Sequence, residues 1–563
     1  MRSKQALAKN LHGGDLHSGP IAGVPKAVSE TPKIGSVATF EYKFILLFAL
    51  GLCGVSSIPY MVGRVAPFPG SVFTDILAYE ADANNYLAYA HQAAAGAWLF
   101  HNPMTGEPHT AVFFNFEWLL MGKVAAVFHL SPGSAMNVLR LLFAVIMCFA
   151  VYWLSAYCLH NIFLRRAALV AVMTGGGFGW LLLSHLLNVL RVPVDQSYFY
   201  DLRAGLFPYF WTLMLPHFLV AGAFATLGLC LYLRAERNRR VSNYIGAGLL
   251  YLLTGSCRPY DMAYLAGATG LYLGISFVRS KKLSWAFILR ATPILMCVPL
   301  LGYYYWIFRI HPVFRWWSNA GRVPPAPWAL TFSFGLSFFI LLLALWHLRA
   351  QRLGDAGTLM VSCLVTTAAL IYSYRFLHFS FQFATDILVP LVMVVFLGLE
   401  RPLTQWIQKG RWARVSIMIL LAVNGLTSVA LTAQTARLAW RGSYRIDQRL
   451  VEAYTWLDNH SQPDELVLAD FDNSNRIPQY GHNRVFCGYS NTVRFAEKTE
   501  AVDLFFVPGT SNVVREGLLR QNAIRYVLLN QEEARQLTVL RNAPFVNQVF
   551  ANDAAVIYAV PAM

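Results

Sequence analysis

The sequence predicts an α-helical polytopic membrane protein with a small soluble α/β domain at its C-terminal end. The first observation is composition, because 56% of the 563 residues are hydrophobic and only 13% are charged. That charged fraction is about half of what a soluble globular protein carries. The second observation is a series of apolar runs, each about 20 residues long, the length that crosses a hydrocarbon core. The third is a change to soluble composition after residue 439.

The apolar runs recur along most of the chain, which excludes a single N-terminal signal peptide as their source. Together they predict about eleven membrane crossings. The expected spans are residues 43–63, 134–158, 167–190, 210–233, 243–257, 259–278, 284–308, 328–348, 357–374, 378–398 and 415–436. These spans and their links form a transmembrane domain, residues 43–439. The polar leader, residues 1–42, is rich in Gly, Pro and Ser and is expected to be disordered and cytoplasmic.

The formal net charge of +16 is distributed as membrane topology requires. Basic residues are concentrated in short links between the apolar runs, such as "LRAERNRR" (233–240), "RSKK" (279–282) and "QKGRWAR" (408–414). An excess of Lys and Arg is typical of cytoplasmic loops. The charge therefore gives an orientation for the chain, and nucleic acid is not expected as a partner.

With the basic links inside, the first span leaves the membrane outward and the span at 134–158 enters from the same side. Residues 64–133 therefore form a large external loop, called the first loop below. Its apolar stretch 111–130 cannot cross without breaking this parity, and it contains Glu117 and Lys123, which are costly in lipid. We expect an amphipathic helix lying on the outer surface of the membrane.

Residues 440–563, called the tail below, read as a small external α/β domain. Helical patterns are expected at 449–460 and 511–522. Strands are expected at "ELVLAD", "NRVFCGY", "IRYVLLN" and "AAVIYAV". The chain has no Gly-rich phosphate loop and no metal-ligand spacing, and most of its eight cysteines lie within apolar runs. The glycines of "MTGGGFGWLL" (173–182) lack a following Lys-Ser/Thr pair, so they predict a helix break or close helix packing.

Carboxylates gather at the start of the first loop, in "FTDILAYEADANNYLAYAHQ" (73–92), which has no Lys or Arg. If this segment is helical, Asp75 and Asp82 share a face with Tyr86, and Glu80 lies next to them in sequence. A carboxylate among tyrosines can accept the proton of an incoming hydroxyl. The alternative is a solvated acidic loop that obeys the charge rule.

A second set of polar groups is expected at the outer ends of the spans. It comprises His217, Arg258 with Asp261, and Arg375 with His378. Arginine holds phosphate through paired hydrogen bonds, and charged groups at membrane depth usually have a partner or a task. The alternative is a set of snorkelling side chains and local ion pairs. The aromatic loop 309–328 fits either a carbohydrate contact or an interfacial aromatic belt.

This arrangement resembles the GT-C superfamily of integral-membrane glycosyltransferases, which includes protein O-mannosyltransferases and aminoarabinose transferases. The resemblance covers about residues 40–563. It rests on the single N-terminal span, the first loop with "EADANNY", the surface helix, the external tail and the Asp82-x-x-x-Tyr86 spacing. The sequence "GEPHTAVFF" (106–114) stands where relatives have His-Pro-Pro or Lys-Pro-Pro, and the adjacent Asp-Glu of O-mannosyltransferases is missing.

The resemblance implies a polyprenyl-phosphate-linked sugar donor and a first-loop aspartate as general base. By position Asp82 matches that base, with Glu80 and Asp75 as rivals, and Glu107 and His109 replace the missing element. We expect inverting transfer to an acceptor hydroxyl at the outer face of a bacterial-type inner membrane, with the tail in the periplasm. The residues expected at the donor phosphate are Arg258, Arg375, His217 and His378. Those expected on the acceptor side are Tyr86, Glu107 and His109.

The expected partners are the lipid-linked sugar, the bilayer, and a glycan, lipid or protein acceptor. No cofactor or metal is expected for a lipid monophosphate, although a diphosphate donor would bring in a divalent ion. The main alternative is a transporter or flippase for lipid-linked or anionic solutes. A non-catalytic scaffold for polysaccharide assembly is a third reading. Transporters commonly show two related halves with paired broken helices, and no such halves are apparent in this sequence.

Overall fold

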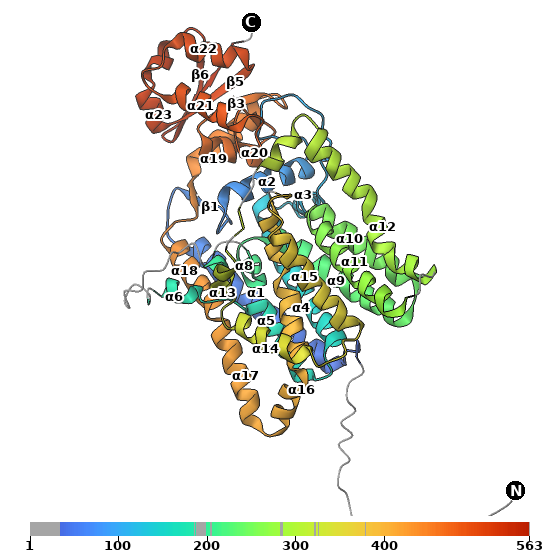
Figure 1. The fold of residues 1–563 in the computed structure, drawn as a ribbon. Coiled ribbons are helices and arrows are strands. Elements are labelled where there is room, and N and C mark those ends of the chain that lie inside the picture. Colours follow the sequence, from blue (N-terminus) through green and yellow to red (C-terminus); the bar gives the residue numbers. More distant parts are fainter. Residues whose placement is uncertain are drawn as a thin grey trace, which may run out of the picture.

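The computed structural model describes residues 34–184, 186, 199–202, 205–281, 285–319, 323–324, 326–377 and 379–561. Most of the expected leader and the site candidate His378 lie outside these described residues. The chain forms a tall helical part, and the tail sits at one end of it as a separate α/β layer (Figure 1). The first loop lies between the two.

The helical part is built from helices of very different lengths. Unbroken helices are α1 (Thr39–Val65), α4 (Pro132–Cys158), α9 (Pro216–Asn238), α10 (Val241–Cys257), α11 (Asp261–Ser280), α12 (Trp285–Tyr305), α15 (Asp355–Ile371) and α16 (Leu388–Gln408). Shorter pieces are α5 (Ile162–Thr174), α6 (Gly179–Leu183), α8 (Pro208–Leu213), α13 (Pro327–Phe334), α14 (Leu336–Leu348), α17 (Arg411–Asn424) and α18 (Leu426–Trp440). A π-helical turn, Trp306–Ile310, follows α12, and a 3₁₀ segment, Ser380–Asp386, precedes α16.

Within the described residues, five helices are long and apolar enough to span a membrane, and up to seven spans result if each bent helix pair is one. The chain is therefore a multi-pass membrane protein. The other predicted crossings stay predictions, since α15 is only 17 residues long and the stretch predicted at 167–190 is interrupted after Thr174.

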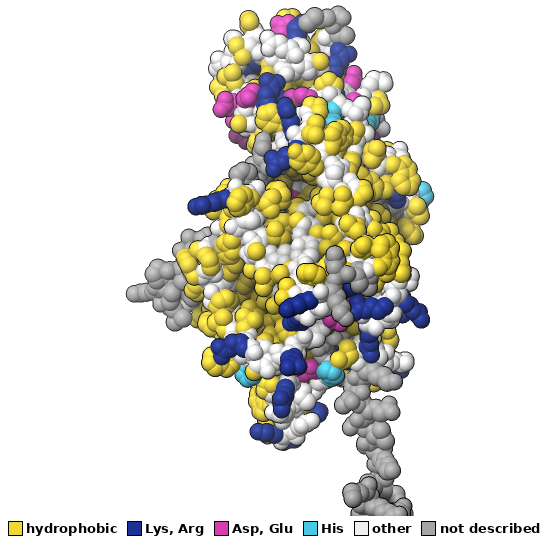
Figure 2. Space-filling model, turned by 45° about the vertical axis from the view of Figure 1, so that its right-hand side comes forward, with side chains coloured by type: hydrophobic (Ala, Val, Ile, Leu, Met, Phe, Trp, Pro, Cys, Tyr) yellow, Lys and Arg dark blue, Asp and Glu magenta, His cyan; other side chains and the backbone are white. Residues whose placement is uncertain are grey.

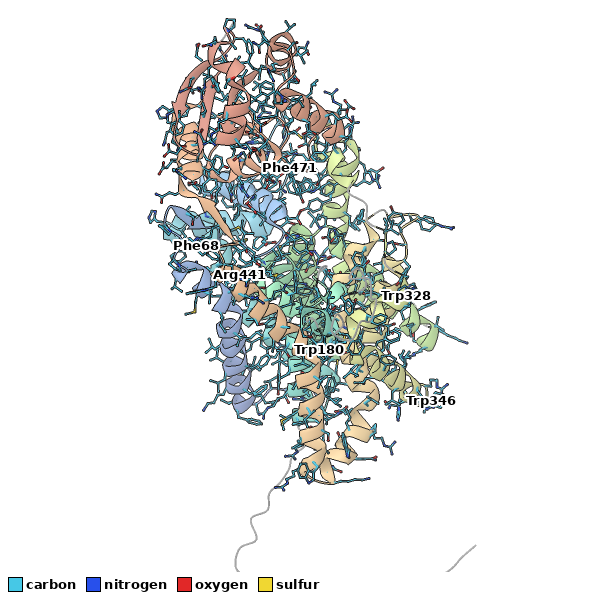
Figure 3. All side chains as sticks on the ribbon, turned by 90° about the vertical axis from the view of Figure 1, so that its left-hand side faces the viewer. Phe68, Trp180, Trp328, Trp346, Arg441 and Phe471 are labelled. Carbon is cyan, nitrogen blue, oxygen red and sulfur yellow. The ribbon has the colours of Figure 1, made fainter. Side chains whose placement is uncertain are left out.

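The surface supports a membrane position for the helical part. Hydrophobic side chains cover its middle, whereas Lys and Arg gather at the end far from the tail and acidic side chains are most frequent on the tail (Figure 2). Leu47 and Met61 of α1 are 70% and 65% exposed. Trp328 and Trp346 project from the edge of the helical part (Figure 3). An apolar belt of this size is stable only when lipid covers it.

The glycine run both breaks a helix and allows close packing, as the sequence predicts. Helix α5 ends before Gly175, and the amides of Gly177 and Gly179 donate to one carboxylate oxygen of the buried Asp201, at 3.0 and 2.9 Å. A Cβ at Gly177 would run into the backbone carbonyl of Ser333. Next to it, the helix pair α13–α14 bends by 105° at Gly335, whose φ is +53°.

The first loop contains β1 (Ser71–Phe73), α2 (Glu80–Ala94) and α3 (Phe116–Phe128). Helix α3 corresponds to the predicted surface helix but is packed differently. Gly122 lies directly against the backbone of α2, Glu117 is buried, and Lys123 donates to the Ala93 carbonyl at 2.8 Å. The two charges that suggested an exposed polar face therefore point into the molecule, and only the end of α3, at Val127 and Phe128, is strongly exposed.

The tail contains β2 (Arg445–Asp447) and a five-stranded sheet of order β4-β3-β5-β7-β6. Its elements are α19 (Gln448–His460), β3 (Leu466–Leu468), α20 (Phe471–Tyr480), β4 (Arg484–Val485), α21 (Phe495–Phe506), α22 (Asn512–Gln521), β5 (Ile524–Asn530), α23 (Gln531–Gln536), β6 (Asn547–Ala551) and β7 (Ala555–Ala559). Strands β4, β3 and β5 are parallel, and β7 and β6 are antiparallel. The four predicted strands correspond to β3, β4, β5 and β7.

The tail is joined to the first loop by a short antiparallel pair of strands. Val72 of β1 lies opposite Ile446 of β2, and the Arg445 side chain donates to the Ser71 carbonyl at 3.1 Å. Phe68 and Arg441 mark this junction between the helical part and the tail (Figure 3). Strand pairing fixes the position of the tail relative to α2, and α2 carries the first-loop carboxylates.

Candidate active site

The tail packs directly on the acidic end of α2. The hydroxyl of Tyr489 donates a hydrogen bond to the Asp82 carboxylate. Two residues further along α2, Asn84 donates to the side-chain oxygen of Asn475 at 2.8 Å, and both amides are buried. Glu80 lies 2.6 Å from Arg476 of α20. These contacts give α2 a defined rotation, so the face that carries Asp82 is fixed by the tail.

Tyr86 follows Asp82 by one helical turn and is surrounded by rings. Its ring stacks on Trp118 of α3, with centroids 5.2 Å apart, and lies 5.1 Å from the His217 ring. Burial and then the negative charge of Asp82 raise the pKa of the Tyr86 hydroxyl well above its usual value. Tyr86 is therefore a neutral hydrogen-bond donor and acceptor beside the Asp82 carboxylate.

Glu117 and His217 form a buried pair behind Tyr86. The Nδ1 atom of His217 lies 2.6 Å from a Glu117 carboxylate oxygen, and the Glu117 side chain is only 1% exposed. A carboxylate on one ring nitrogen fixes the orientation of the imidazole, as in catalytic histidine pairs. The sequence pointed to both residues separately, and the fold brings them together from positions 100 apart in the chain.

Arg258 lies near this pair and is bonded to several partners. Its guanidinium is 3.0 Å from Asp261, donates to Tyr260 at 3.1 Å and to Thr385 at 2.8 Å, and lies 4.7 Å from the Phe218 ring. The side chain is 1% exposed. The predicted Arg258–Asp261 local pair is therefore present. Nη2 also donates to the Gln382 carbonyl at 3.3 Å, so four of the five N–H groups of Arg258 have a partner and one on Nη1 is left for a ligand.

The Asp261 and Asp386 carboxyl groups, both buried, are hydrogen-bonded to each other, so one of them holds a proton. Oε1 of Glu117 is buried and has no hydrogen-bond partner among the described residues. Buried polar atoms are normally hydrogen-bonded, so this oxygen is open to a donor from water or from a ligand.

An aromatic layer supports the site from the side of the loop at 309–328. Trp317 lies 6.0 Å from Trp118 and 5.2 Å from Phe113, measured between ring centroids, and Tyr89 stacks on Trp118 at 4.6 Å. Trp317 therefore packs inside the molecule against the first loop. In this arrangement it holds α3 and Trp118 in place beneath Tyr86.

Each of the other first-loop candidates is bonded to a partner of its own. Asp75, at φ +60°, forms an ion pair with Arg64 at 2.9 Å. Glu107 pairs with Lys498 of the tail at 2.8 Å, and hydrogen bonds from Lys498 and Thr105 outweigh burial and lower the pKa of Glu107. His109 donates from Nδ1 to the Glu107 carbonyl at 2.8 Å. The structure thus separates Glu107 and His109 from the Asp82 group and places them against the tail.

Of the remaining predicted phosphate ligands, Arg375 is exposed in the turn between α15 and the 3₁₀ segment, and no hydrogen bond or ion pair joins it to another described residue. His378 lies outside the described residues. No group of three or more His, Cys, Asp or Glu side chains in the described part of the chain is placed to hold a metal ion.

Sequence reasoning missed Tyr489, Asn475, Tyr260 and Asp386. Tyr489 ends a predicted strand, and nothing near it in sequence indicates a partner 407 positions away. Asp386 had a usable signal, because it is an acidic residue inside the predicted span 378–398. Tyr260 lies close to Arg258 in the sequence. The predicted pairing of Arg258 with Asp261 gave no indication that the Tyr260 hydroxyl also accepts a hydrogen bond from Arg258.

Neither protein-family models nor curated proteins match this sequence. Solved structures do. The apo crystal structure of the Archaeoglobus fulgidus oligosaccharyltransferase matches with a TM-score of 0.56 at 12% identity, covering 93% of this chain and 75% of that one. The same archaeal enzyme tethered to an acceptor peptide containing the NVT sequon gives a TM-score of 0.41 at 14% identity, covering 93% and 74%. This chain has the GT-C fold.

This is the fold that the resemblance drawn from the first loop and the tail implies. The described acidic cluster combines α2 and α3 of the first loop with the N-terminal ends of α9 and α11 and the 3₁₀ segment before α16. The tail closes it through Tyr489. The site is thus assembled from parts that span most of the chain.

Proposed function

We propose that this protein is a glycosyltransferase that moves a sugar from a polyprenyl-phosphate donor to an acceptor hydroxyl at the outer membrane face. The observation that carries the proposal is the position of Asp82. It lies on α2 of a GT-C fold, hydrogen-bonded by Tyr489, one turn from Tyr86 and beside a buried group of acids around Arg258. The unpartnered Glu117 oxygen can accept a hydrogen bond from a hydroxyl group of the ligand.

In the proposed reaction, Asp82 accepts the proton of the acceptor hydroxyl. The hydroxyl oxygen forms a bond to the anomeric carbon from one face while the bond from that carbon to the phosphate oxygen breaks on the other. The lipid phosphate leaves with the electron pair, and the configuration inverts. A general base of this kind typically contributes about 10²–10⁴ in rate. Tyr86, neutral and adjacent, donates a hydrogen bond to the acceptor or the sugar.

We assign two kinds of stabilisation to the departing phosphate, one through an electrostatic field and one through direct contact. Most N–H groups of Arg258 are already bonded, so we assign it an effect mainly through its electrostatic field, from behind Tyr260 and Asp261. Arg375 is exposed and is the basic group free to approach a phosphate at the membrane surface. His217 is oriented by Glu117 toward Tyr86, and we assign it to the sugar side of the phosphate. Developing negative charge is stabilised most by groups positioned beforehand.

From this proposal follows where the donor, the leader and the tail lie relative to the membrane. The donor's isoprenoid would lie along the apolar helices, the leader would be cytoplasmic, and the tail would face the periplasm of a bacterial-type inner membrane. The acceptor is a glycan, lipid or protein hydroxyl. With a monophosphate donor the reaction is expected to proceed in EDTA, whereas a diphosphate donor would require a divalent ion.

The decisive experiment measures sugar release from a panel of radiolabelled polyprenyl-phosphate sugars by the purified protein. In Asp82→Asn we expect turnover to fall by about 10²-fold or more with donor binding retained. Glu80→Gln and Asp75→Asn are the matched comparators, because both side chains are engaged by arginines and should keep most activity. Full turnover in Asp82→Asn, with loss in a comparator, would transfer the base to that residue.

One observation favours the transporter or flippase alternative. Three helix interruptions, after Thr174, at Gly335 and at Gly425, lie together around Asp201, and discontinuous helices with a buried acid are common in transporters. The same labelled donors in liposomes separate the two functions. Movement of intact donor across the bilayer without sugar release would establish transport and reject the transferase.

A further inference from the structure

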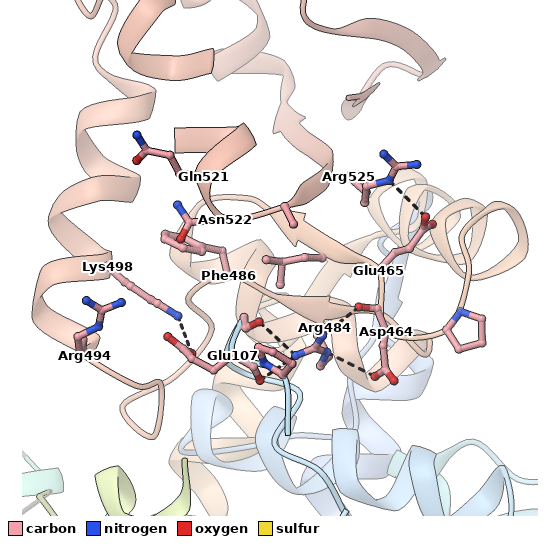
Figure 4. A pocket seen from close by; sticks show the side chains of 15 residues that line it. Glu107, Asp464, Glu465, Arg484, Phe486, Arg494, Lys498, Gln521, Asn522 and Arg525 are labelled. Atoms are coloured by element: carbon pink, nitrogen blue, oxygen red, sulfur yellow. Dashed lines mark hydrogen bonds and ion pairs between the residues drawn. The ribbon is translucent and has the colours of Figure 1, made fainter. Parts of the chain in front are cut away.

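A polar hollow of about 620 Å³ lies where the first loop meets the tail (Figure 4). It is open to solvent on the tail's side of the molecule. The residues of the first loop that line it are Gly106, Glu107 and Pro108. Those of the tail are Pro463, Asp464, Glu465, Leu466, Arg484, Phe486, Arg494, Lys498, Gln521, Asn522, Ala523 and Arg525.

The base of the hollow is rigid. Lys498 is 5% exposed and lies 2.8 Å from Glu107, while Arg484 donates to the backbone carbonyl of Glu107 at 2.9 Å. Figure 4 shows Lys498, Glu107 and Arg484 side by side at this end. Because the charges here are buried and paired, they form a fixed floor rather than groups that reorganise.

Two arginines at opposite ends of the hollow are available to a ligand (Figure 4). Arg494 is 55% exposed and lies 3.6 Å from Glu497, which is 69% exposed, and Arg525 is 40% exposed and lies 3.5 Å from Glu465. Exposed ion pairs of this geometry contribute about 0–1 kcal/mol, so a ligand can replace them at little cost. Gln521 and Asn522 lie between the two arginines (Figure 4).

The side chains that line the hollow favour one class of ligand. It has four basic and three acidic side chains, two amides, and one aromatic ring, Phe486, which is 3% exposed and lies under the Lys498 ammonium. There is no apolar anchor for a lipid chain, and the excess of one positive charge is too small for nucleic acid. Alternating planar donors and acceptors suit a ring with many hydroxyls and one negative charge.

The hollow is connected to Asp82 by one short segment of the tail. Tyr489 donates to Asp82, the Asn491 carbonyl accepts from the Asn102 side-chain amide, and the Val493 amide donates to Thr105. Arg494, at the hollow, follows Tyr489 by five residues, which limits the distance between their Cα atoms to about 18 Å. A chain of a few sugar units reaches from one to the other.

We infer that the hollow binds an acidic saccharide, a sugar bearing a carboxylate, as the distal part of the acceptor glycan. The inference that this saccharide is an acceptor rests on the proposed transferase function, but its binding does not. Arg525 holds the carboxylate, Arg494 at the opposite end of the hollow binds hydroxyls together with Gln521 and Asn522, and the acceptor's reacting hydroxyl extends from Arg494 along residues 489–493 toward Asp82.

The test is equilibrium binding to the purified full-length chain, without donor. The probes are glucuronosyl-N-acetylglucosamine and its neutral galactosyl counterpart. We expect the acidic disaccharide to bind at least about tenfold more tightly than the neutral one, as loss of a charge-assisted hydrogen bond implies. Arg494→Gln and Arg525→Gln should each lower its affinity about tenfold. Arg535→Gln, at an exposed site on α23 away from the hollow, is the matched control and should change nothing.

Equal binding of the two disaccharides, or affinity unchanged in both hollow variants, would overturn the inference. So would equal competition by inorganic phosphate, which marks a simple anion site, or tighter binding of an acidic peptide. Asp82→Asn separates this inference from the proposed function. Saccharide binding by the wild type and by that variant, with no sugar released from any donor by the wild type, would reject the transferase and keep the saccharide site.

Discussion

The Tyr489 hydroxyl donates a hydrogen bond to the Asp82 carboxylate, although the two residues are 407 positions apart. The tail is thus part of the candidate active site rather than an appended domain. The bond uses one lone pair of Asp82 and fixes the direction of its carboxylate relative to Tyr86. A general base must be aimed at the proton that it removes, so the contact gives the tail a direct effect on the proposed chemistry.

Tyr489→Phe keeps the ring and removes this hydrogen bond. We expect kcat to fall about tenfold or more, with KM for the lipid donor little changed, because a hydrogen bond to a charged group contributes about 1.5–3 kcal/mol. Steady-state kinetics with the donor identified above measures the effect. Tyr526→Phe, which removes a hydroxyl bonded to the His460 carbonyl on the same domain, is the control and should be silent. A fall of the same size in both variants would indicate a general loss of tail structure.

The tail is held on α2 more by buried amide side chains than by the partly exposed ion pair of Arg476 with Glu80. Asn475→Ala leaves the Asn84 amide without its acceptor and removes donors to the Ala81 and Gly488 carbonyls. We expect a loss of about 1–3 kcal/mol in the free energy of unfolding. Arg476→Ala breaks a partly exposed pair with Glu80 and should cost less than about 1 kcal/mol. Denaturant titration compares them, and the reverse order would contradict this account.

Acid should loosen the first loop through His109. Its Nε2 accepts the Asn102 amide at 2.7 Å, a bond that only the neutral ring can make, and burial lowers the pKa of His109 to about 4. The unfolded chain binds this proton near pH 6.5, so it holds more protons between pH 6.5 and 4. The His109 contribution is therefore complete above pH 6.5 and is lost as the pH falls through that window.

The measurement for His109 is the thermal midpoint from pH 7.5 to 4.5. His109→Gln should show a smaller acid-induced fall than the wild type, while His129→Gln, at an exposed helix end, should follow the wild type. Parallel curves for His109→Gln and the wild type would show that this ring does not carry the acid sensitivity.

Gly177→Ala should destabilise the helical part strongly. The new Cβ would overlap the Ser333 carbonyl oxygen, and backbone atoms on both sides cannot move without shifting α13. Overpacking of this kind costs about 1–3 kcal/mol. Gly302→Ala, on an exposed face of α12 with no atom near the added Cβ, should be neutral or slightly stabilising. A thermal-shift assay in detergent distinguishes them, and a neutral Gly177→Ala would show that the helix break is not tightly packed.

Much of the fold could be predicted because its signals are local. Apolar runs predict α1, α4, α9 and α16, and alternation predicts the strands β3, β5 and β7, since each reflects the period of its own backbone. The interpretation of α3 was less complete. Its charges suggested an exposed face, but the chain buries Glu117 against His217 and bonds Lys123 to the Ala93 carbonyl. Sequence shows that a charge is present and does not show which distant group will neutralise it.

By itself, the sequence determined that this is a membrane protein with an acidic first loop and a soluble tail, and it put Asp82 and Tyr86 one turn apart on a helix. Only the tertiary structure decided that Tyr489 meets Asp82, that Glu117 meets His217, and that Arg258 is enclosed by Tyr260, Asp261 and Thr385. The physical reason is the separation along the chain of the residues that interact. Helix and strand periodicity are set by neighbouring residues, whereas a hydrogen bond between distant segments depends on how every intervening element packs.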